Sequence, residues 1–343
     1  MSPDRGRVLL CIHGDTAEIP AVSRALGERG VEPLLIDTAR YPTDLPLTLE
    51  WDRGGGFRAG WAGGSIGASE IIDAVWQGVV VGRDLPAMDP GTHRTCIGSA
   101  EMALLGMLDG SGAFQLDPSW RRARAENKPY QLRVAQRVGL EVPETIVTND
   151  AGAVRALAGR CDRLVTKMLV QPMTAGAGDD ETVVFTTELG AADLDRLEGL
   201  ELCPMIFQER IENALDLRVT VAGRQVHAAA VGAGGRVGDD LDWRRDSHDQ
   251  GRAAAWTAHE LPPAIAARLI AMLDHLELNY GAFDLIVTPG GRHVFLELNP
   301  AGSFSFLGAA HEALIAGAIA DLLVDPGARR IPAAAPIAGP RHG

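Results

Sequence analysis

The stretch from Gly281 to Leu307 limits the possible folds of this chain most strongly, because it predicts a β-hairpin. Two apolar runs rich in β-branched and aromatic residues, 282–288 and 292–298, flank the segment Pro289-Gly290-Gly291. Such runs are typical of strands, and the two glycines suit a two-residue loop that needs positive φ angles. We therefore expect the two runs to pair as antiparallel neighbours, with Gly290-Gly291 as the loop.

Three oxygen-bearing side chains would meet on one face of this hairpin. With that loop, Asp284 lies opposite Glu297, and Asn299 shares the face of Glu297. Opposed Cβ atoms are about 5 Å apart, and two buried carboxylates at this distance need a neutralising cation. Carboxylate and amide oxygens suit Mg²⁺, which leaves its other positions to water and substrate phosphates. The alternative is a pair of acids that face solvent, although both lie inside apolar runs.

Length, charge and cysteines restrict the class of protein. A chain of 343 residues suggests two or three domains. Its net charge of −13 disfavours nucleic acid and anionic membranes as partners, because both attract basic surfaces. The sequence has no apolar run of the roughly 18 residues that a membrane span requires. Its four cysteines have no metal or redox spacing and indicate reduced thiols, so we expect a cytoplasmic protein.

The first third of the chain predicts an open α/β domain. A strand at 7–13, a helix at 20–29 and a strand at 31–37 form a βαβ unit with parallel strands. The dinucleotide-binding motif GxGxxG does not follow the first strand. Further strands are expected at 47–51, 57–61 and 74–81, and a helix at about 99–107.

From Asp117 the pattern changes to helices mixed with antiparallel strands. Residues 121–139 form a cationic amphipathic segment, with Pro129 in a first helical turn and Gly139 as a C-cap. The Gly-rich, acidic residues 174–180 predict a loop. The other expected elements are strands at 145–148, 164–170, 182–187, 205–210, 216–221 and 225–231, and helices at 151–158, 262–276 and 309–323.

Two lysines are candidates for holding an anion. Lys167 lies in the middle of an apolar strand, where a lysine must either extend its amine to water or meet an anion. Lys128 opens a helix well upstream, where a solvated charge is the plain alternative. From separate elements, the two could hold a polyphosphate as point charges.

Three further segments could complete a nucleotide site. In the segment 207–211, backbone amides could bind a purine edge and a carboxylate could bind ribose hydroxyls; an ordinary edge strand is the alternative. Asp216 and Arg218 share one face of a strand, where a structural ion pair competes with a functional role. Arg244, with Arg245 as its rival, could stabilise a transferring phosphoryl group or hold a carboxylate.

In this order, the motifs resemble those of the ATP-grasp ligases and, within that superfamily, the graspetide (microviridin-type) peptide ligases. The similar stretches are AENKPYQLRVAQRVGLEVP, IVTND, FQERIENALDLRVTVAG, DLDWR, LNYGAFDLIVTPGG and VFLELNPAG. The resemblance implies an α/β protein, α+β in the clamp, with an ATP-grasp fold. Its expected parts are a pre-ATP-grasp domain at 1–116, a central subdomain at 117–204, a C-terminal subdomain with the metal site at 205–328 and a disordered tail at 329–343.

The resemblance also implies a role for each candidate residue. The nucleotide-binding residues would be Lys128, Lys167, Gln208, Glu209, Ile211 and Asp216. The ligands of Mg²⁺, of which we expect two ions, would be Asp284, Glu297 and Asn299. The catalytic residues would be Arg244, facing the γ-phosphate or an acyl phosphate, and Arg218, facing the substrate carboxylate.

The implied reaction is an ATP-dependent ligation within a ribosomal precursor peptide. An Asp or Glu side chain becomes an acyl phosphate with release of ADP, and a Ser or Thr hydroxyl or a Lys amine then displaces the phosphate. The product would be an ester or amide macrocycle. A leader segment of the precursor would dock on the enzyme, and we expect a homodimer. The alternatives are a ligase that acts on a small molecule or extends a protein terminus, and an ATP-binding regulator without turnover.

The sequence departs from the family pattern at two places. After ELNPAG the family typically continues with Gln-Trp, whereas here Ser303-Phe304 follows. After a Val-Trp pair the family typically has an arginine-rich stretch, whereas here Val75-Trp76 is followed by Gln77-Gly78. Both departures concern the expected substrate and leave the expected ATP site unchanged.

Overall fold

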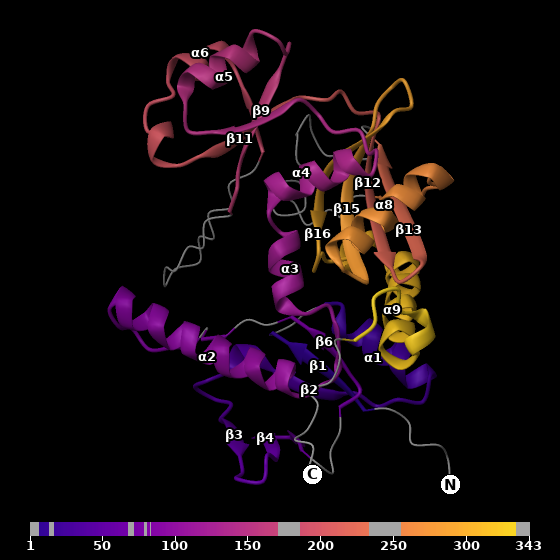
Figure 1. The fold of residues 1–343 in the computed structure, drawn as a ribbon. Coiled ribbons are helices and arrows are strands. Elements are labelled where there is room, and N and C mark those ends of the chain that lie inside the picture. Colours follow the sequence, from indigo (N-terminus) through magenta and orange to yellow (C-terminus); the bar gives the residue numbers. More distant parts are fainter. Residues whose placement is uncertain are drawn as a thin grey trace, which may run out of the picture.

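The fold consists of an N-terminal α/β unit, a small upper lobe and a larger antiparallel sheet between them (Figure 1). The small lobe contains β9 (Leu164–Met168) and β11 (Met205–Glu209), and the larger sheet contains β12 (Leu215–Ala222) and β15 (Tyr280–Val287). The computed structural model describes residues 7–13, 17–67, 72–78, 81–82, 84–170, 186–232 and 255–333.

The N-terminal unit is built on a four-stranded parallel sheet in the order β2-β1-β6-β7. Its βαβ unit confirms the expected parallel arrangement, because α1 (Ile19–Glu28) connects two adjacent parallel strands. The strands are β1 (Val8–Ile12), β2 (Leu34–Asp37), β6 (Ala74–Gln77) and β7 (Phe114–Leu116).

A second, three-stranded sheet and a long helix complete this unit. The sheet consists of β3 (Leu47–Trp51), β4 (Phe57–Trp61) and β5 (Gly64–Ile66). The helix α2 (Pro90–Gly110) begins well before the expected position, because the side chain of Asp89 accepts hydrogen bonds from two backbone amides of its first turn. The polar first half of α2 has no apolar stripe, which is why the pattern did not predict it.

The small lobe is a four-stranded sheet in the order β10-β9-β11-β8, with helices on one face. Its remaining elements are β8 (Thr145–Thr148), β10 (Thr187–Leu189), α5 (Ala151–Ala158) and α6 (Ala191–Asp195). The side chain of Asp150 caps α5, as predicted, by accepting from the amide of Gly152 at 2.8 Å. Phe207 packs on the helical face, so alternation turns Lys167 and Gln208 to the opposite face.

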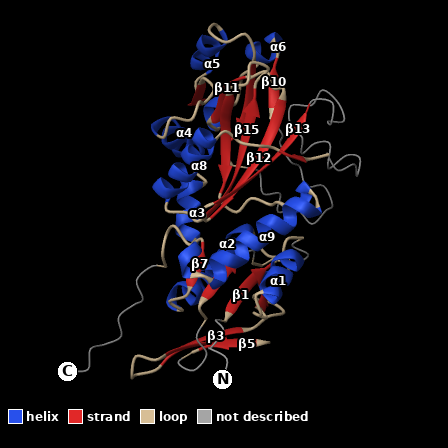
Figure 2. Cartoon of the chain, turned by 90° about the vertical axis from the view of Figure 1, so that its right-hand side faces the viewer, coloured by secondary structure: helices blue, strands red, loops and turns tan. Residues whose placement is uncertain are grey.

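The large sheet has the order β14-β13-β12-β15-β16 and is covered on both faces (Figure 2). The helices α4 (Lys128–Arg137) and α8 (Pro263–Leu276) pack on one face, and α9 (Ala309–Val324) packs on the other. The other elements are α3 (Ser119–Ala125), β13 (Gln225–Gly232), β14 (Thr257–Ala258) and β16 (His293–Asn299). Among the helices of the described ranges, none is long and apolar enough to cross a membrane.

The hairpin of β15 and β16 has a different loop from the expected one. The amide of Thr288 donates to the carbonyl of Arg292 at 2.9 Å, so the loop is Pro289-Gly290-Gly291, and the expected two-residue loop is wrong. Gly291 has a φ of 79°, as the third residue of such loops requires. A β-bulge at Leu296 compensates for the extra loop residue, and Asp284 still pairs with Glu297.

The last helix joins the large sheet to the N-terminal unit. The helix α9 packs against α1, and Arg29 forms an ion pair with Asp321 at 2.7 Å. The chain beyond α9 is also held, because Arg330 donates to the carbonyls of Gly223 at 2.6 Å and Leu278 at 2.8 Å. Residues 329–331 therefore differ from the expected disordered tail, whose residues 334–343 lie outside the described ranges.

Candidate active site

The acids of the hairpin lie together between the small lobe and the large sheet. Asp284 and Glu297 are 8% and 7% exposed. The side-chain nitrogen of Asn299 is 3.0 Å from Oδ2 of Asp284 and 3.4 Å from Oε1 of Glu297. Three polar side chains on two paired strands thus converge, as the hairpin pattern predicts.

Among the described residues, three cationic side chains lie beside these two carboxylates. The Nζ atoms of Lys128 and Lys167 are 2.7 and 3.7 Å from Oε2 of Glu297. Nη1 of Arg218 is 2.9 Å from Oδ1 of Asp284. Lys128 and Lys167 are the only lysines of the whole chain, whose other cationic side chains are arginines and histidines. Two ammonium groups and a guanidinium gathered at one place are groups that can also bind a polyanion.

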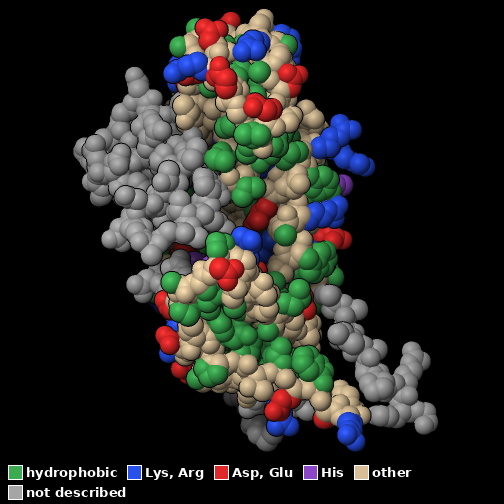
Figure 3. Space-filling model, turned by 90° about the vertical axis from the view of Figure 1, so that its left-hand side faces the viewer, with side chains coloured by type: hydrophobic (Ala, Val, Ile, Leu, Met, Phe, Trp, Pro, Cys, Tyr) green, Lys and Arg blue, Asp and Glu red, His purple; other side chains and the backbone are tan. Residues whose placement is uncertain are grey.

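Local structure explains why the lysines reach the acids. Asn127 caps α4 by accepting from the amide of Tyr130 at 3.0 Å, so Lys128 is the first helical residue. Its ammonium therefore adds to the positive end of the helix dipole. Lys167 projects from the face of its lobe that is turned away from α5. Figure 3 shows the molecule from the left-hand side of Figure 1. A hollow lies at the middle of this view, with basic and acidic side chains at its bottom.

Arg218 is held from two sides, which a guanidinium that is 4% exposed requires. Besides the bond to Asp284, its Nη2 donates to the carbonyl of Ser303 at 2.9 Å. Its Cζ lies 5.7 Å from the centroid of the Phe306 ring. Gly302 makes this approach possible, because a Cβ there would lie 2.4 Å from Nη2 of Arg218. The expected alternative of an ion pair is thus present, with Asp284 of the neighbouring strand as partner.

Gln131 fixes the position of β16, an edge strand. Its side-chain nitrogen donates to the carbonyl of Leu298 at 2.8 Å, and its oxygen accepts from the amide of Leu298 at 2.9 Å. These bonds complete the outer edge of the strand between Glu297 and Asn299. Sequence reasoning missed Gln131, because nothing local indicates that this helical residue faces a strand.

The residues predicted to hold the nucleotide lie along the small lobe and the connection to β12. Gln208 is buried and donates to Oγ1 of Thr145 at 2.9 Å. Oε2 of Glu209 lies 3.4 Å from the amide of Glu144, and Ile211 follows β11. Oδ1 of Asp216 accepts from Asn213 at 2.8 Å.

The structure leaves two predicted parts of the site without description. Arg244 and its rival Arg245 lie outside the described residues, as does the Gly-rich loop 174–180. The roles of the predicted residues toward a nucleotide therefore stay predictions.

The donor set of the hairpin fits a magnesium ion. Asp284, Glu297 and Asn299 offer hard oxygen donors, and a half turn of the Asn299 amide would present its oxygen to the two carboxylates. Among the described residues, no group of three or more His, Cys, Asp or Glu side chains is arranged to hold a metal ion, so the amide of Asn299 would have to supply the third ligand. An ion held by two carboxylates and an amide would keep positions for water and phosphates, which is the usual arrangement of Mg²⁺.

The fold and this site define an ATP-grasp ligase: a small antiparallel lobe and a larger antiparallel sheet face each other across two lysines and an acid pair. Residues 7–123 match the family model of the MvdD pre-ATP grasp domain. The chain is 34% identical to the macrocyclase MdnC from Microcystis aeruginosa MRC, solved with its precursor peptide MdnA, over 93% of this chain and 99% of that one, with a TM-score of 0.81. The chain therefore belongs to the graspetide-type family of ATP-grasp ligases.

Two further relatives extend the comparison. A RiPP-associated ATP-grasp ligase of Chryseobacterium gregarium, solved with ADP and a leader and core peptide, is 28% identical over 96% of this chain and 99% of its own, with a TM-score of 0.85. A probable alpha-L-glutamate ligase of Enterobacter sp. (strain 638) is 29% identical over 61% of this chain and 72% of its own length. The chain is thus similar to ligases whose names give different substrates.

Proposed function

We propose that this protein uses ATP to join an Asp or Glu side chain of a precursor peptide to a Ser or Thr hydroxyl or a Lys amine, with release of ADP and phosphate. The observation that carries this proposal is the arrangement of Lys128, Lys167 and Arg218 around Asp284 and Glu297. A site with these charges can hold a polyphosphate beside a second anion, the carboxylate to be activated. We place the reaction in the cytoplasm, where ATP is supplied.

Each group of residues has a proposed role in this reaction. Lys128 and Lys167 bind phosphates of ATP. The adenosine is held by Gln208, Glu209 and Ile211, with Asp216 near the ribose or phosphates and Arg244 near the transferred phosphate. Asp284, Glu297 and Asn299 would hold Mg²⁺, which when bound neutralises charge on the phosphates.

Arg218 orients the carboxylate that reacts. A carboxylate oxygen forms a bond to the γ-phosphorus while the bond to the β-phosphate oxygen breaks, and ADP leaves. The hydroxyl or amine then bonds to the acyl carbon, the bond from this carbon to the phosphate oxygen breaks, and the proton of the acceptor leaves with phosphate or water. Lysine and arginine lower the repulsion between the anionic reactants, so positioning and electrostatics supply most of the rate.

A second candidate function is the addition of an amino acid to a peptide or protein terminus. The observation that favours it is the 29% identity to the probable glutamate ligase of Enterobacter. The two functions differ in their product, because macrocyclisation removes one water per bond, whereas addition increases the mass of the acceptor.

The test is to incubate the protein with ATP, Mg²⁺ and the short peptides encoded by the reading frames next to its gene. We expect ADP together with a loss of 18 Da per bond, read by mass spectrometry. A mass increase with free glutamate present would favour the second candidate. No peptide-stimulated ADP with either substrate would contradict both.

We also propose that the protein is a homodimer and that the precursor docks through a leader segment. Light scattering coupled to size exclusion gives the mass of the assembly, and a measured mass of one chain would contradict the dimer. Truncation of the leader should raise the KM for the peptide without changing ADP formation at saturation.

A further inference from the structure

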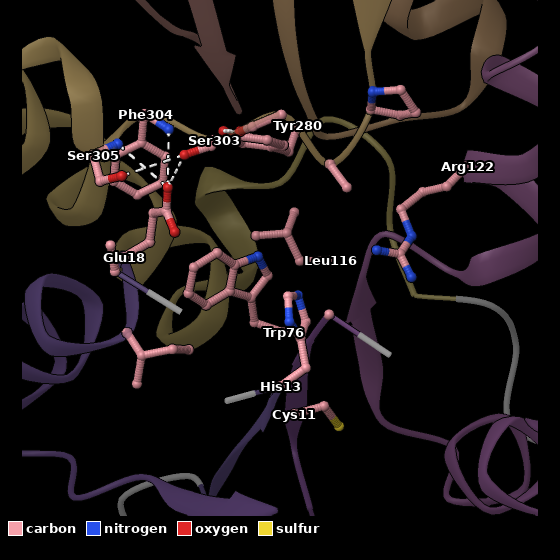
Figure 4. A pocket seen from close by; sticks show the side chains of 16 residues that line it. Cys11, His13, Glu18, Trp76, Leu116, Arg122, Tyr280, Ser303, Phe304 and Ser305 are labelled. Atoms are coloured by element: carbon pink, nitrogen blue, oxygen red, sulfur yellow. Dashed lines mark hydrogen bonds between the residues drawn. The ribbon is translucent and has the colours of Figure 1, made fainter. Parts of the chain in front are cut away.

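A cavity of about 390 Å³ lies between the N-terminal unit and the loop that follows β16 (Figure 4). From the N-terminal side it is lined by His13 after β1, Gly78 after β6 and Leu116 at the end of β7. These strands are parallel, so the cavity lies at the carboxyl edge of the sheet, where open α/β sheets bind ligands. The opposite wall is the loop 300–305.

The cavity shares this wall with the candidate active site. The carbonyl of Ser303 accepts from Arg218, and the carbonyl of Gly302 accepts from the hydroxyl of Tyr280 at 2.6 Å. Arg218 in turn contacts Asp284. Gly302 and Ser303 therefore belong both to the wall of the cavity and to the surroundings of Arg218, so the cavity adjoins the candidate active site at this loop.

The two departures from the family pattern meet at this cavity. Ser303 and Phe304 stand where Gln-Trp is typical, and Gly78 stands in the stretch after Val75-Trp76 where arginines are typical. Ser303, Phe304 and Gly78 line the cavity, and so does Trp76. The part of the molecule that sets this chain apart from the family pattern is thus separate from the lysines and the acid pair.

Glu18 gives the cavity a negative end. It is 7% exposed, and its Oε1 accepts from the hydroxyl of Ser303 and from the amides of Phe304 and Ser305 at 3.2 and 3.3 Å. Burial alone would raise the pKa of Glu18, but these hydrogen bonds lower it below its usual value, so the carboxylate is charged at neutral pH. Figure 4 shows the other carboxylate oxygen on the side away from the loop.

Arg122 lies on the other side of the cavity from Glu18, and Trp76 and Leu116 lie between them (Figure 4). Burial lowers the pKa of Arg122, although the nearby Asp117 and Glu126 oppose this effect. The carboxylate of Glu18 repels an acidic side chain from the end next to Ser303 and attracts a hydrogen-bond donor. The charge of Glu18 therefore favours a hydrogen-bond donor at the end of the cavity next to Ser303.

Resting on the proposed function, we propose that this cavity is the acceptor subsite of the ligase. The hydroxyl- or amine-bearing side chain of the peptide enters between Trp76 and Phe304 and donates a hydrogen bond to Glu18. Glu18 orients this nucleophile, whose oxygen or nitrogen bonds to the acyl carbon as the bond from this carbon to the phosphate oxygen breaks, and the proton of the nucleophile leaves with the phosphate or water. The N-terminal unit thus selects the acceptor, while the ATP-grasp part activates the carboxylate.

The test is Glu18→Gln, with Glu28→Gln on the exposed end of the same helix as the control. The amide keeps an oxygen for the loop but loses the charge that holds the donor. We expect ATP affinity to stay unchanged and bond formation to fall about tenfold, the scale of a hydrogen bond to a charged group. Because the acyl phosphate still forms and is then hydrolysed, ADP released per bond should rise above one.

Two further measurements separate a loss of acceptor binding from a general loss of activity. Ala17→Trp adds bulk at the exposed rim of the cavity and leaves the carboxylate of Glu18 in place, and it should cause the same excess of ADP. The wild-type protein should show this excess with a precursor peptide whose Ser, Thr and Lys are all replaced by alanine. A fall in bond formation with one ADP per bond in both variants would overturn the subsite. Absence of ADP in the wild type would instead refute the proposed function.

Discussion

Glu297 is the residue on which the site depends most, because it contacts groups from three elements. Its carboxylate lies near Lys128 of α4, Lys167 of β9 and Asn299 of its own strand. A carboxylate that is 7% exposed needs such partners, since burial without them is costly. The same carboxylate oxygens would also bind Mg²⁺. Glu297 therefore contributes both to the ion pairs of the folded protein and to the proposed metal site.

Glu297→Gln should lower turnover about a hundredfold or more, the scale of losing one group that stabilises charge in a transition state. The amide is isosteric and can still accept from Lys128, so the melting temperature should stay within a few degrees of the wild type. Steady-state ADP release and thermal unfolding measure both. Glu260→Gln, at an exposed position, is the control. Turnover like that of the wild type would rule out the metal assignment.

Lys167→Ala should weaken binding of ATP with Mg²⁺ about tenfold, because a charge-assisted contact to phosphate is lost. Titration calorimetry measures the affinity, and Arg133→Ala removes an exposed charge as the control. Since the chain has two lysines, acetic anhydride offers a second check. Bound ATP should protect both side chains from acetylation. Equal labelling with and without ATP would remove them from the site.

At the scale of elements, the bulge at Leu296 decides where the hairpin side chains point. In a regular strand Phe295 and Glu297 would share a face. The extra residue instead places Phe295 opposite Leu285, in the core with Phe283, and Glu297 opposite Asp284. One strand thus serves both a packed core and a charged site.

The loop after β16 couples this hairpin to Arg218, and Gly302 is its tightest point. A Cβ at Gly302 would lie 2.4 Å from Nη2 of Arg218 and 2.7 Å from Cβ of Ala282. Gly302→Ala should therefore displace Arg218 and lower kcat/KM for the peptide at least about tenfold, while ATP affinity stays unchanged. Gly290→Ala at the hairpin tip is the control, because a Cβ there would meet only Oγ1 of Thr288, at an ordinary contact distance of 3.9 Å. Equal peptide kinetics in the two variants would contradict the role of Arg218.

At the scale of the molecule, Asp117 joins the N-terminal unit to the large sheet. Its Oδ2 accepts from the amides of Asn279 and Tyr280 at 2.9 and 3.0 Å. Burial raises the pKa of this carboxyl to about 6, although the two amides and the nearby Arg121 and Arg122 lower it. Relative to the unfolded chain, the folded state therefore holds a proton more tightly between about pH 4 and 6.

This shift gives a pH dependence of stability with a defined sign. Because the folded state binds more protons in that window, the contribution of Asp117 to stability falls as pH rises from about 4 to 6. Relative to Asp117→Asn, the wild type should lose about 2–3 kcal/mol of unfolding free energy over this range. Urea unfolding at several pH values measures it, with Asp162→Asn at an exposed position as the control. Parallel curves for wild type and Asp117→Asn would contradict the raised pKa.

The local sequence pattern was sufficient to predict the elements in which that pattern is strong. The βαβ unit, the cap at Asp150 and the pairing of Asp284 with Glu297 could be predicted, because alternation, capping and turn residues act over a few positions. The loop of the hairpin could not be predicted. A third loop residue shifts the pairing by one position, the bulge at Leu296 shifts it back, and the same pair of acids stays opposed.

What the sequence determined by itself is the set of chemical groups: two lysines, an acid pair with an amide, and strands that present them. Only the tertiary structure decided that Glu18, Gln131 and Ser303 lie near these groups. Glu18 and Ser303 are 285 positions apart in the chain, and no local pattern records a contact over such a distance. The contact exists because α9 and the parallel sheet bury a common core, which brings the end of β1 to the end of β16.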